Sequence, residues 1–226
     1  TAFAIHTVTS WVFAVTPRAG WDSTIFGPYF ISGAFVSGTA AVIIAMFFYR
    51  KSFKLSEYLT DEHFNKIGKV LVLVSALYLY FNLNEFLVPG YKLKTADAYH
   101  LKELFAGKHA LLFWSVQLFG LIIPIVLLFI RKIRRPLPLM MISLVMLAAS
   151  WFKRYIIVVP PQEHPFLPVQ NMPVEWLIYK PTLIETLVTL ASFILVLIII
   201  TVLSKLFPVI PIHEMAEERQ TKAIGG

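Results

Sequence analysis

Four long apolar stretches dominate the chain and limit what it can fold into: residues 28–49, 70–88, 109–130 and 181–204. As a helix, each is long enough to cross the roughly 30 Å hydrocarbon core of a bilayer, and each carries few or no charges. Residues 137–159 form a fifth such stretch. Charged residues make up only 15% of the chain, against about 25% in soluble domains. The sequence therefore predicts an all-α integral membrane protein, a bundle of about five complete transmembrane helices.

The two ends of the chain add to this bundle. Residues 1–16 are apolar like the end of a sixth helix, and they lack the basic region of a signal peptide. We expect residues 17–27 to form an outer loop, 28–207 the five-helix bundle and 208–226 a cytoplasmic tail. The chain is interpreted as the C-terminal part of a larger membrane protein.

Basic residues are unevenly divided between the two sides of the expected bundle. Twelve Lys and Arg lie in residues 50–69, in 131–135 and from Lys205 onward, against six in the opposite loops. The more basic side is expected to face the cytoplasm, which predicts a multi-pass protein of the inner (cytoplasmic) membrane. The net charge of +7 then sets orientation and attracts membrane lipids rather than nucleic acid.

Six ionisable side chains lie in or beside the apolar stretches, toward the outer side: His6, Asp22, Glu85, Lys153, Arg154 and Glu185. Such groups are costly in a bilayer and usually face a cavity or the interior of a bundle. We expect them to line one cavity in the outer half. Ser75, Tyr78, Asn82 and Glu85 share a helical face, although hydrogen bonding between helices alone also explains such a stripe.

Metal and haem sites are not expected in this chain. It has no cysteine, which excludes disulfides and cysteine-ligated zinc or iron–sulfur clusters within it. His63 and His100 are interpreted as solvated loop residues, and His109 as interfacial. His6 and His109 are the only candidates for haem ligands within the spans, and their expected depths differ.

Several motifs resemble one known family. They are His6-Thr-Val-Thr-Ser-Trp11, Gly20-Trp-Asp-Ser-Thr-Ile-Phe-Gly-Pro-Tyr-Phe-Ile-Ser-Gly-Ala34 with Ser37-Gly38, Tyr58-Leu-Thr-x-x-His63, Trp151-Phe-Lys-Arg154-Tyr and Phe207-Pro-Val-Ile-Pro211. This pattern resembles the NrfD-like family, which includes the polysulfide reductase membrane subunit and the large membrane subunits of alternative complex III. The resemblance covers most of the chain and implies the C-terminal part of an NrfD-like fold.

The resemblance implies a haem-free membrane subunit that oxidises quinol or reduces quinone (menaquinone or ubiquinone) near the outer face. Such a subunit exchanges electrons with a ferredoxin-like iron–sulfur subunit, often beside molybdopterin or multihaem cytochrome subunits. His6 and Asp22 match positions near the family's quinone pocket and are the expected catalytic residues, and Arg154 joins them in binding the quinone. The outer loops, residues 91–108, 162–179 and the segment around Asp22, are the expected docking surface for the partner.

The chemistry of quinol oxidation suits these residue types. It releases two protons with two electrons, and imidazole is a suitable proton acceptor near neutral pH. Glu85, Lys153 and Glu185 are the expected proton-transfer residues. Two alternatives remain at this stage: a secondary transporter or proton-translocating subunit that uses the same charges, and a cytochrome b.

Overall fold

The computed structural model describes residues 2–92, 94–163, 173 and 178–207. The chain divides into two compact units, residues 1–177 and 178–226. Five helices are long and apolar enough to span a membrane, which confirms the expected all-α membrane fold. The expected cytoplasmic tail, His213 and most of the expected docking loop at 162–179 lie outside the described residues.

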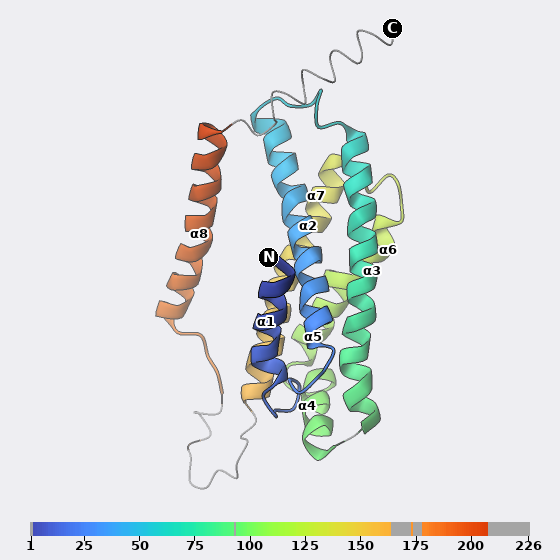
Figure 1. Cartoon of the computed structure of the whole chain (residues 1–226), viewed down its shortest axis with the longest axis vertical. Helices are drawn as coiled ribbons and strands as arrows, with labels where there is room; N and C mark the ends of the chain where they lie inside the picture. Colours follow the sequence, from blue (N-terminus) through green and yellow to red (C-terminus); the bar gives the residue numbers. More distant parts are fainter. Residues whose placement is uncertain (1, 93, 164–172, 174–177, 208–226) are drawn as a thin grey trace. The chain divides into compact units, whose positions relative to one another are not determined.

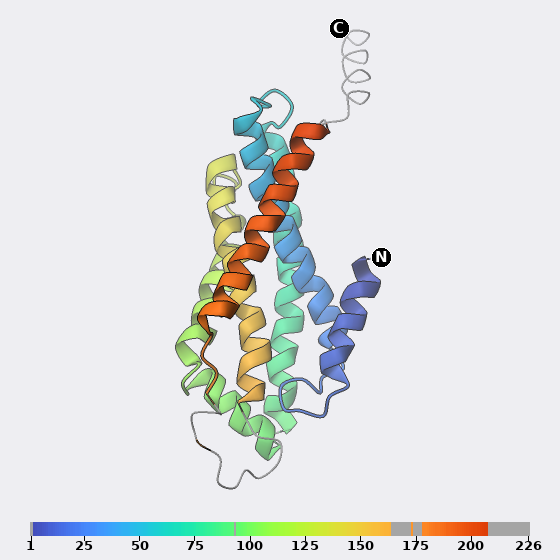
Figure 2. The same cartoon turned by 90° about the vertical axis from the view of Figure 1, so that its left-hand side faces the viewer.

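In the first unit the helices run in chain order as α1 (Ala2–Ala14), α2 (Phe26–Ser52), α3 (Asp61–Lys92), α4 (Thr95–Phe105), α5 (Ala110–Gln117), η1 (Leu118–Ile122), α6 (Ile123–Leu128) and α7 (Pro136–Gln162). Helix α2 packs against α1, α3 and α7. The shorter α1 lies beside the half of α2 that begins at Phe26 (Figures 1 and 2).

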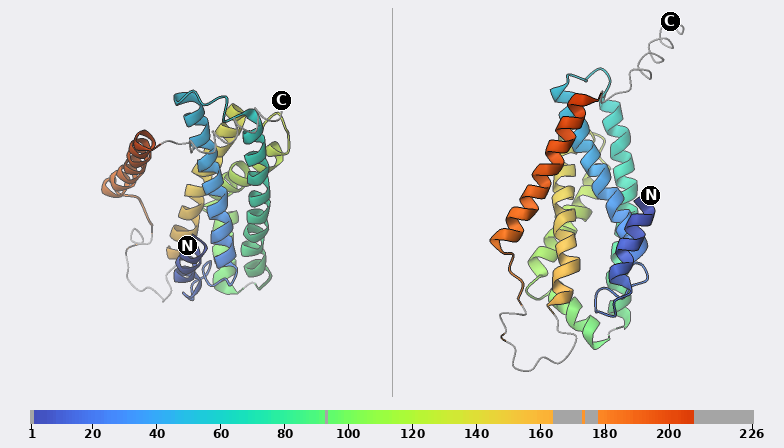
Figure 3. Two further views of the ribbon diagram at one scale, coloured as in Figure 1. Left: turned by 45° about the horizontal axis from the view of Figure 1, so that its top comes forward. Right: turned by 60° about the vertical axis from the view of Figure 1, so that its left-hand side comes forward.

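Two apolar clusters hold the first unit together. One joins α2, α3, α6 and α7 through seven buried side chains: Val36, Ile43, Phe64, Leu71, Leu128, Leu139 and Met146. The other joins α4, α5 and α7 through Leu104, Phe113, Val116 and Ile156. Helix α4 lies at the end opposite the 53–60 connection (Figure 3). That end is the expected outer side.

Helix α4 was not expected from the sequence, which was interpreted as a loop between residues 89 and 108. Its buried residues Asp97, His100, Leu101 and Leu104 follow the i, i+3, i+4, i+7 spacing of one helical face. The expectation that His100 is solvated was therefore wrong, since this side chain is only 6% exposed. A short amphipathic helix covers the bundle end there.

Helices α3 and α7 continue through prolines near their outer ends, beyond the apolar stretches at 70–88 and 137–159. Helix α3 continues through Pro89 to Lys92, and α7 continues through Pro160 and Pro161 to Gln162. Each proline lies in the last turns, where its missing N–H removes one helical hydrogen bond without stopping the chain. On α7 this leaves the carbonyl of Ile157 without its usual helical donor at position 161.

The second unit contains α8 (Leu183–Leu206). Its first turn is closed by a capping box, in which Thr182 Oγ1 accepts from Glu185 N and the Glu185 carboxylate accepts from Thr182 N. This arrangement satisfies two otherwise unpaired N–H groups at the helix start. Within its own unit, Glu185 is thus a capping residue.

Candidate functional site

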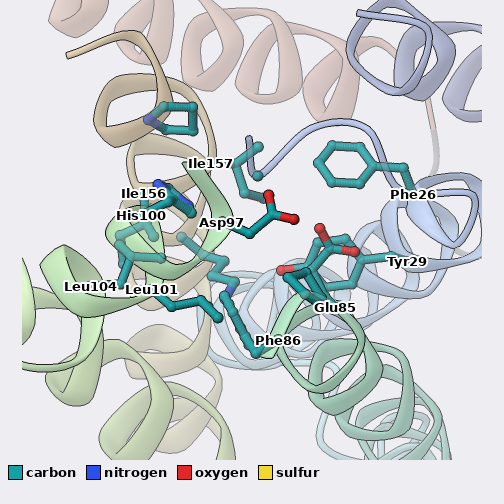
Figure 4. Close-up of a pocket in the computed structure, with 14 residues that line it drawn as sticks. Phe26, Tyr29, Glu85, Phe86, Asp97, His100, Leu101, Leu104, Ile156 and Ile157 are labelled. Carbon is teal, nitrogen blue, oxygen red and sulfur yellow. The ribbon is translucent and has the colours of Figure 1, made fainter. Parts of the chain in front are cut away.

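A small cavity lies inside the first unit at the end covered by α4. Its volume is about 30 Å³, enough for one or two water molecules and too small for an organic cofactor. Figure 4 shows Glu85 from α3 and Asp97 from α4 directing their carboxyl groups into the same region. The polar side chains around it are Glu85, Asp97, His100, Tyr29 and Lys153.

Glu85 and Lys153 are two buried ionisable residues of this cavity. Glu85 is 7% exposed and Lys153 is 4% exposed. Among the described residues, neither Glu85 Oε2 nor Lys153 Nζ has a hydrogen-bond partner. Ser23 gives the Glu85 carboxyl group a side-chain hydrogen bond, and the charge of Lys153 acts on it. Buried charges need such compensation, so the two residues favour each other's position.

Aromatic rings surround the ammonium group of Lys153. Its Nζ atom lies 4.6 Å from the ring centre of Phe86, 5.5 Å from that of Phe113 and 5.9 Å from that of Tyr29. Ring faces attract a cation electrostatically. The rings and Glu85 together account for a lysine in the interior of a membrane bundle.

The outer loop, residues 15–25, is held against α7 by two hydrogen bonds to backbone carbonyls. Trp21 Nε1 donates to Ile157 O at 2.6 Å, and Arg18 Nη1 donates to Pro161 O at 2.9 Å. The first bond uses the carbonyl that Pro161 leaves without a helical donor. The prolines of α7 thus help to position the loop that carries Asp22 and Ser23.

Gly20 and His100 meet closely at the edge of the cavity. Gly20 has φ +83°, and a Cβ atom there would lie 2.7 Å from His100 Nε2. Both the conformation and the contact require glycine. Beside them, burial raises the pKa of Asp97 above its ordinary value, and the charge of Asp22 raises it further. Asp22 itself is exposed.

A chain of polar side chains continues from this cavity into the bundle. The hydroxyl groups of Tyr78 and Tyr29 are 3.4 Å apart, and Tyr29 Oη lies 3.4 Å from Asn82 Oδ1. Asn82 Nδ2 donates to Gln117 Oε1 at 3.0 Å. A second cavity of about 20 Å³ is lined by Tyr78, Gln117, Ser150 and Lys153, among others. Lys153 therefore borders both cavities.

The helix that carries Gln117 changes type immediately after it. Residues Leu118–Ile122 form a π-helical turn, η1, of the kind that often occurs at functional sites. A Cβ atom at Gly120 would overlap the Cβ atom of Ala149, so α7 crosses η1 at very short range. This crossing fixes Gln117 beside Ser150 and Lys153.

A larger, open cavity of about 410 Å³ lies between α1, α2 and α3, and several of its lining side chains, among them Phe3, Phe35 and Val42, are exposed. His6 and Thr39 are its polar residues, and the others are apolar or glycine: Phe3, Ile31, Ala34, Phe35, Gly38, Val42, Ile67 and Val70. On α2 the lining runs from Ile31 to Val42, about 8 to 24 Å along the helix from Phe26. The cavity therefore lies at the middle depth of the bundle.

The structure distributes the expected site residues over several places instead of one cavity. His6 lines the 410 Å³ cavity, whereas Glu85 and Lys153 line the 30 Å³ cavity. Arg154 follows Lys153 on α7 but is exposed, and Asp22 lies on the outer loop. The expectation of a single shared cavity is replaced by two separate ones.

Sequence reasoning missed Asp97 and His100 because it placed both in a loop. The helical spacing of Asp97, His100, Leu101 and Leu104 was the available signal. His109, which the sequence places near the membrane interface, is 8% exposed and lies 2.8 Å from Glu163, a pairing that the sequence did not indicate. Pairing between residues 54 positions apart in the chain leaves no local sequence pattern.

Comparison with known families agrees with this architecture. A family model described as "Polysulphide reductase, NrfD" matches residues 1–165, which cover α1 to α7 and all three cavities described above. A search among curated proteins found no matching relative. Proteins of the matched family are membrane subunits of quinone-linked oxidoreductase complexes. The resemblance found in the sequence is thus confirmed, and the chain belongs to the NrfD family.

Proposed function

We propose that the chain binds a quinone or quinol in the 410 Å³ cavity beside His6 and exchanges its electrons with an iron–sulfur partner subunit. The observation that carries the proposal is the cavity itself. Its size falls within the range of organic-ligand pockets, and its walls are largely apolar with few polar groups. The 30 Å³ cavity has room for water alone.

In this proposal His6 accepts a proton from a quinol hydroxyl group. Oxidation of one quinol gives one quinone, two protons and two electrons, and the electrons leave to the partner's iron–sulfur centre. An imidazole side chain can accept a proton near neutral pH. Thr39, the other polar residue of the cavity, offers a hydroxyl group that orients a quinone oxygen.

Glu85 and Lys153 handle protons near the outer face in the same proposal. Both border a cavity that can hold water, and Asp22 lies on the loop beside them, where its charge acts on Glu85. Asp22 passes protons outward. Arg154 is exposed and does not line the cavity beside His6, so it takes no part in the proposed quinone pocket, and Glu185 serves as the capping residue of α8. The outer loops around Asp22, residues 91–108 and 162–179, remain the proposed docking surface for the electron-transfer partner, with molybdopterin or multihaem cytochrome subunits beyond it.

Replacing His6 tests the proposal directly. In the purified complex, His6→Ala is expected to lower the rate of quinol oxidation about a hundredfold, the usual contribution of general base catalysis. His63→Ala is the matched control, because His63 is exposed and bonded locally to Thr60. Equal rates for both variants and the unmodified protein would contradict the role of His6.

Filling the cavity separates quinone binding from proton transfer. Gly38 lines the cavity, and a Cβ atom there would have no heavy atom within 4 Å. Gly38→Leu should therefore occupy the cavity without strain and reduce the amount of co-purifying quinone. Ala41→Leu, on the same helix but outside the lining, is the control. Undiminished quinone in Gly38→Leu would place the quinone elsewhere.

A further inference from the structure

A basic cavity lies at the opposite end of the first unit from α4, between the start of α3 and the turn that precedes α7. Its volume is about 860 Å³. Five of its lining residues are basic and two are acidic: Lys69, Arg131, Lys132, Arg134 and Arg135, with Asp61, Glu62 and also Asn65. The proposed quinone chemistry uses none of them.

The two acids are already matched by bases that do not line the cavity. Asp61 Oδ1 lies 2.7 Å from Arg50 Nη1, and Glu62 Oε1 lies 3.1 Å from Lys66 Nζ. The lining residues Lys69, Lys132 and Arg135 have no anionic partner among the described residues. An uncompensated positive charge therefore faces the cavity.

Arg134 is fixed in place before any ligand arrives. Its Nε donates to Asn65 Oδ1 at 2.7 Å, and its Nη1 donates to Leu128 O at 2.6 Å and Phe129 O at 3.1 Å. Its aliphatic stem packs on Gly68, where a Cβ atom would lie 3.0 Å from Arg134 Cδ. Among the described residues Nη2 has no acceptor, so a positioned guanidinium group keeps two donors for an anion.

The cavity lies at the depth of lipid headgroups. Helix α3 has 32 residues, about 48 Å of helical rise, and it exceeds the roughly 30 Å hydrocarbon core. Residues 61–69, at the start of α3, carry charged side chains and precede the apolar stretch at 70–88, so they lie in the headgroup layer. Large apolar side chains next to the cavity in the sequence are exposed, among them Phe129, Ile130 and Leu137, and they provide a surface for acyl chains.

We propose that this cavity is a specific binding site for an anionic phospholipid, with the headgroup phosphate on Arg134 and the surrounding lysines and arginines. Positive charge at a preorganised guanidinium complements a phosphate, and the exposed apolar residues complement the attached chains. Basic pockets between membrane helices suit such headgroups. A freely soluble phosphate would bind the guanidinium group but would have no acyl chains for the exposed apolar residues.

Lipid retention by the purified full chain tests the proposal. The chain is mixed with equal amounts of dioleoyl phosphatidylglycerol and dioleoyl phosphatidylcholine, and bound lipids are counted by native mass spectrometry. The unmodified chain should retain phosphatidylglycerol preferentially. Lys69→Gln combined with Lys132→Gln should reduce this preference about tenfold or more, since each surface-proximal base contributes appreciably to binding of anionic lipid.

Lys51→Gln combined with Lys54→Gln is the matched control. These lysines lie at the same end of the bundle, are exposed and do not line the cavity. The control should keep the preference, and an equal loss in both double variants would overturn a specific site in favour of general surface charge. Displacement of phosphatidylglycerol by millimolar inorganic phosphate would likewise overturn the lipid assignment, whereas retention supports it.

Discussion

Nε2 of His109 lies 2.8 Å from Oε2 of Glu163, and this contact joins the residue before α5 to the residue after α7. Nζ of Lys108 lies 2.6 Å from the same oxygen. The side chains of His109 and Glu163 are only 10% and 8% exposed. Because His109 and Glu163 are buried, their hydrogen bond stabilises the fold more than a pair of surface charges would.

Replacing Glu163 by Gln should destabilise the protein at neutral pH. Burial raises the pKa of Glu163, but the hydrogen bonds and charges of Lys108 and His109 outweigh it and hold the pKa below its ordinary value. Because the folded state lowers this pKa, the stabilisation is present above about pH 4.3, the ordinary value, and is lost as the pH falls through the folded value. Glu163→Gln should lower the free energy of unfolding by roughly 2 kcal/mol at pH 7.

Thermal unfolding in detergent at a series of pH values measures this effect. The difference between Glu163→Gln and the unmodified protein should shrink as the pH falls below about 4. Glu62→Gln is the control, because its partner Lys66 and Glu62 itself are both 70% exposed and such pairs contribute little. A difference that is independent of pH would show that Glu163 acts through packing instead of charge.

Replacing Asp97 by Asn should stabilise the protein at neutral pH, in contrast to the replacement of Glu163. Burial, followed by the charge of Asp22, raises the pKa of Asp97 in the folded state. A raised carboxyl pKa opposes folding at every pH above the ordinary value of about 3.9, where the unfolded chain ionises more readily. Asp97→Asn should therefore raise the unfolding midpoint at pH 7 and leave it unchanged at low pH.

A contrasting aspartate provides the control for this prediction. Asp61 is paired with Arg50 at 2.7 Å, so Asp61→Asn should lower the unfolding midpoint at pH 7 or leave it unaltered. Stabilisation by both substitutions would point to a general effect of removing negative charge. The comparison isolates the burial of Asp97 as the cause.

The sequence predicts the spanning helices well because the bilayer imposes their length and composition. The apolar stretch at 28–49 corresponds to α2, and the stripe of Ser75, Tyr78, Asn82 and Glu85 faces the bundle interior, where Ser75, Asn82 and Glu85 are buried. Such patterns are local, since each residue's environment follows from its place on one helix.

The arrangement of the candidate site could not be predicted in the same way. Ionisable residues at similar depth were expected to share a cavity, but depth does not determine the direction of a side chain around the bundle. His6 on α1 faces α2 and α3, whereas Glu85 and Lys153 face α4. Helix α4 was missed because its 11 residues include charged side chains and are too few to span a membrane.

Gly20→Ala should disturb the outer cavity. The substitution forces an unfavourable positive φ on alanine, which costs about 1–2 kcal/mol, and brings its Cβ atom to His100 Nε2. The unfolding midpoint should fall. Gly38→Ala is the control: it lies inside α2 with no heavy atom within 4 Å of the new Cβ, so it should raise stability by about 0.5–1 kcal/mol. Equal stability of the two variants would contradict the close contact with His100.

Glu85→Gln should slow quinol oxidation in a pH-dependent manner, if protons leave through the outer cavity as proposed. Glutamine keeps the shape of the side chain and its hydrogen bond from Ser23 but cannot accept a proton. Loss of a proton-transfer group typically costs about a hundredfold in rate. Quinone retention should be unaffected, because Glu85 does not line the cavity beside His6.

Two comparison variants complete this experiment. Glu57→Gln changes an exposed glutamate in the 53–60 connection and should leave the rate and its pH profile unaltered. Lys153→Met keeps an unbranched chain among the rings of Phe86 and Phe113 but removes the charge between the two small cavities, so it should slow turnover as Glu85→Gln does. Both the rate of quinol oxidation and proton release into proteoliposomes are measured for Glu85→Gln, Glu57→Gln and Lys153→Met. Because Glu85 and Lys153 act on one cavity, the double variant should be little slower than either single variant, whereas additive losses would assign them to separate proton routes.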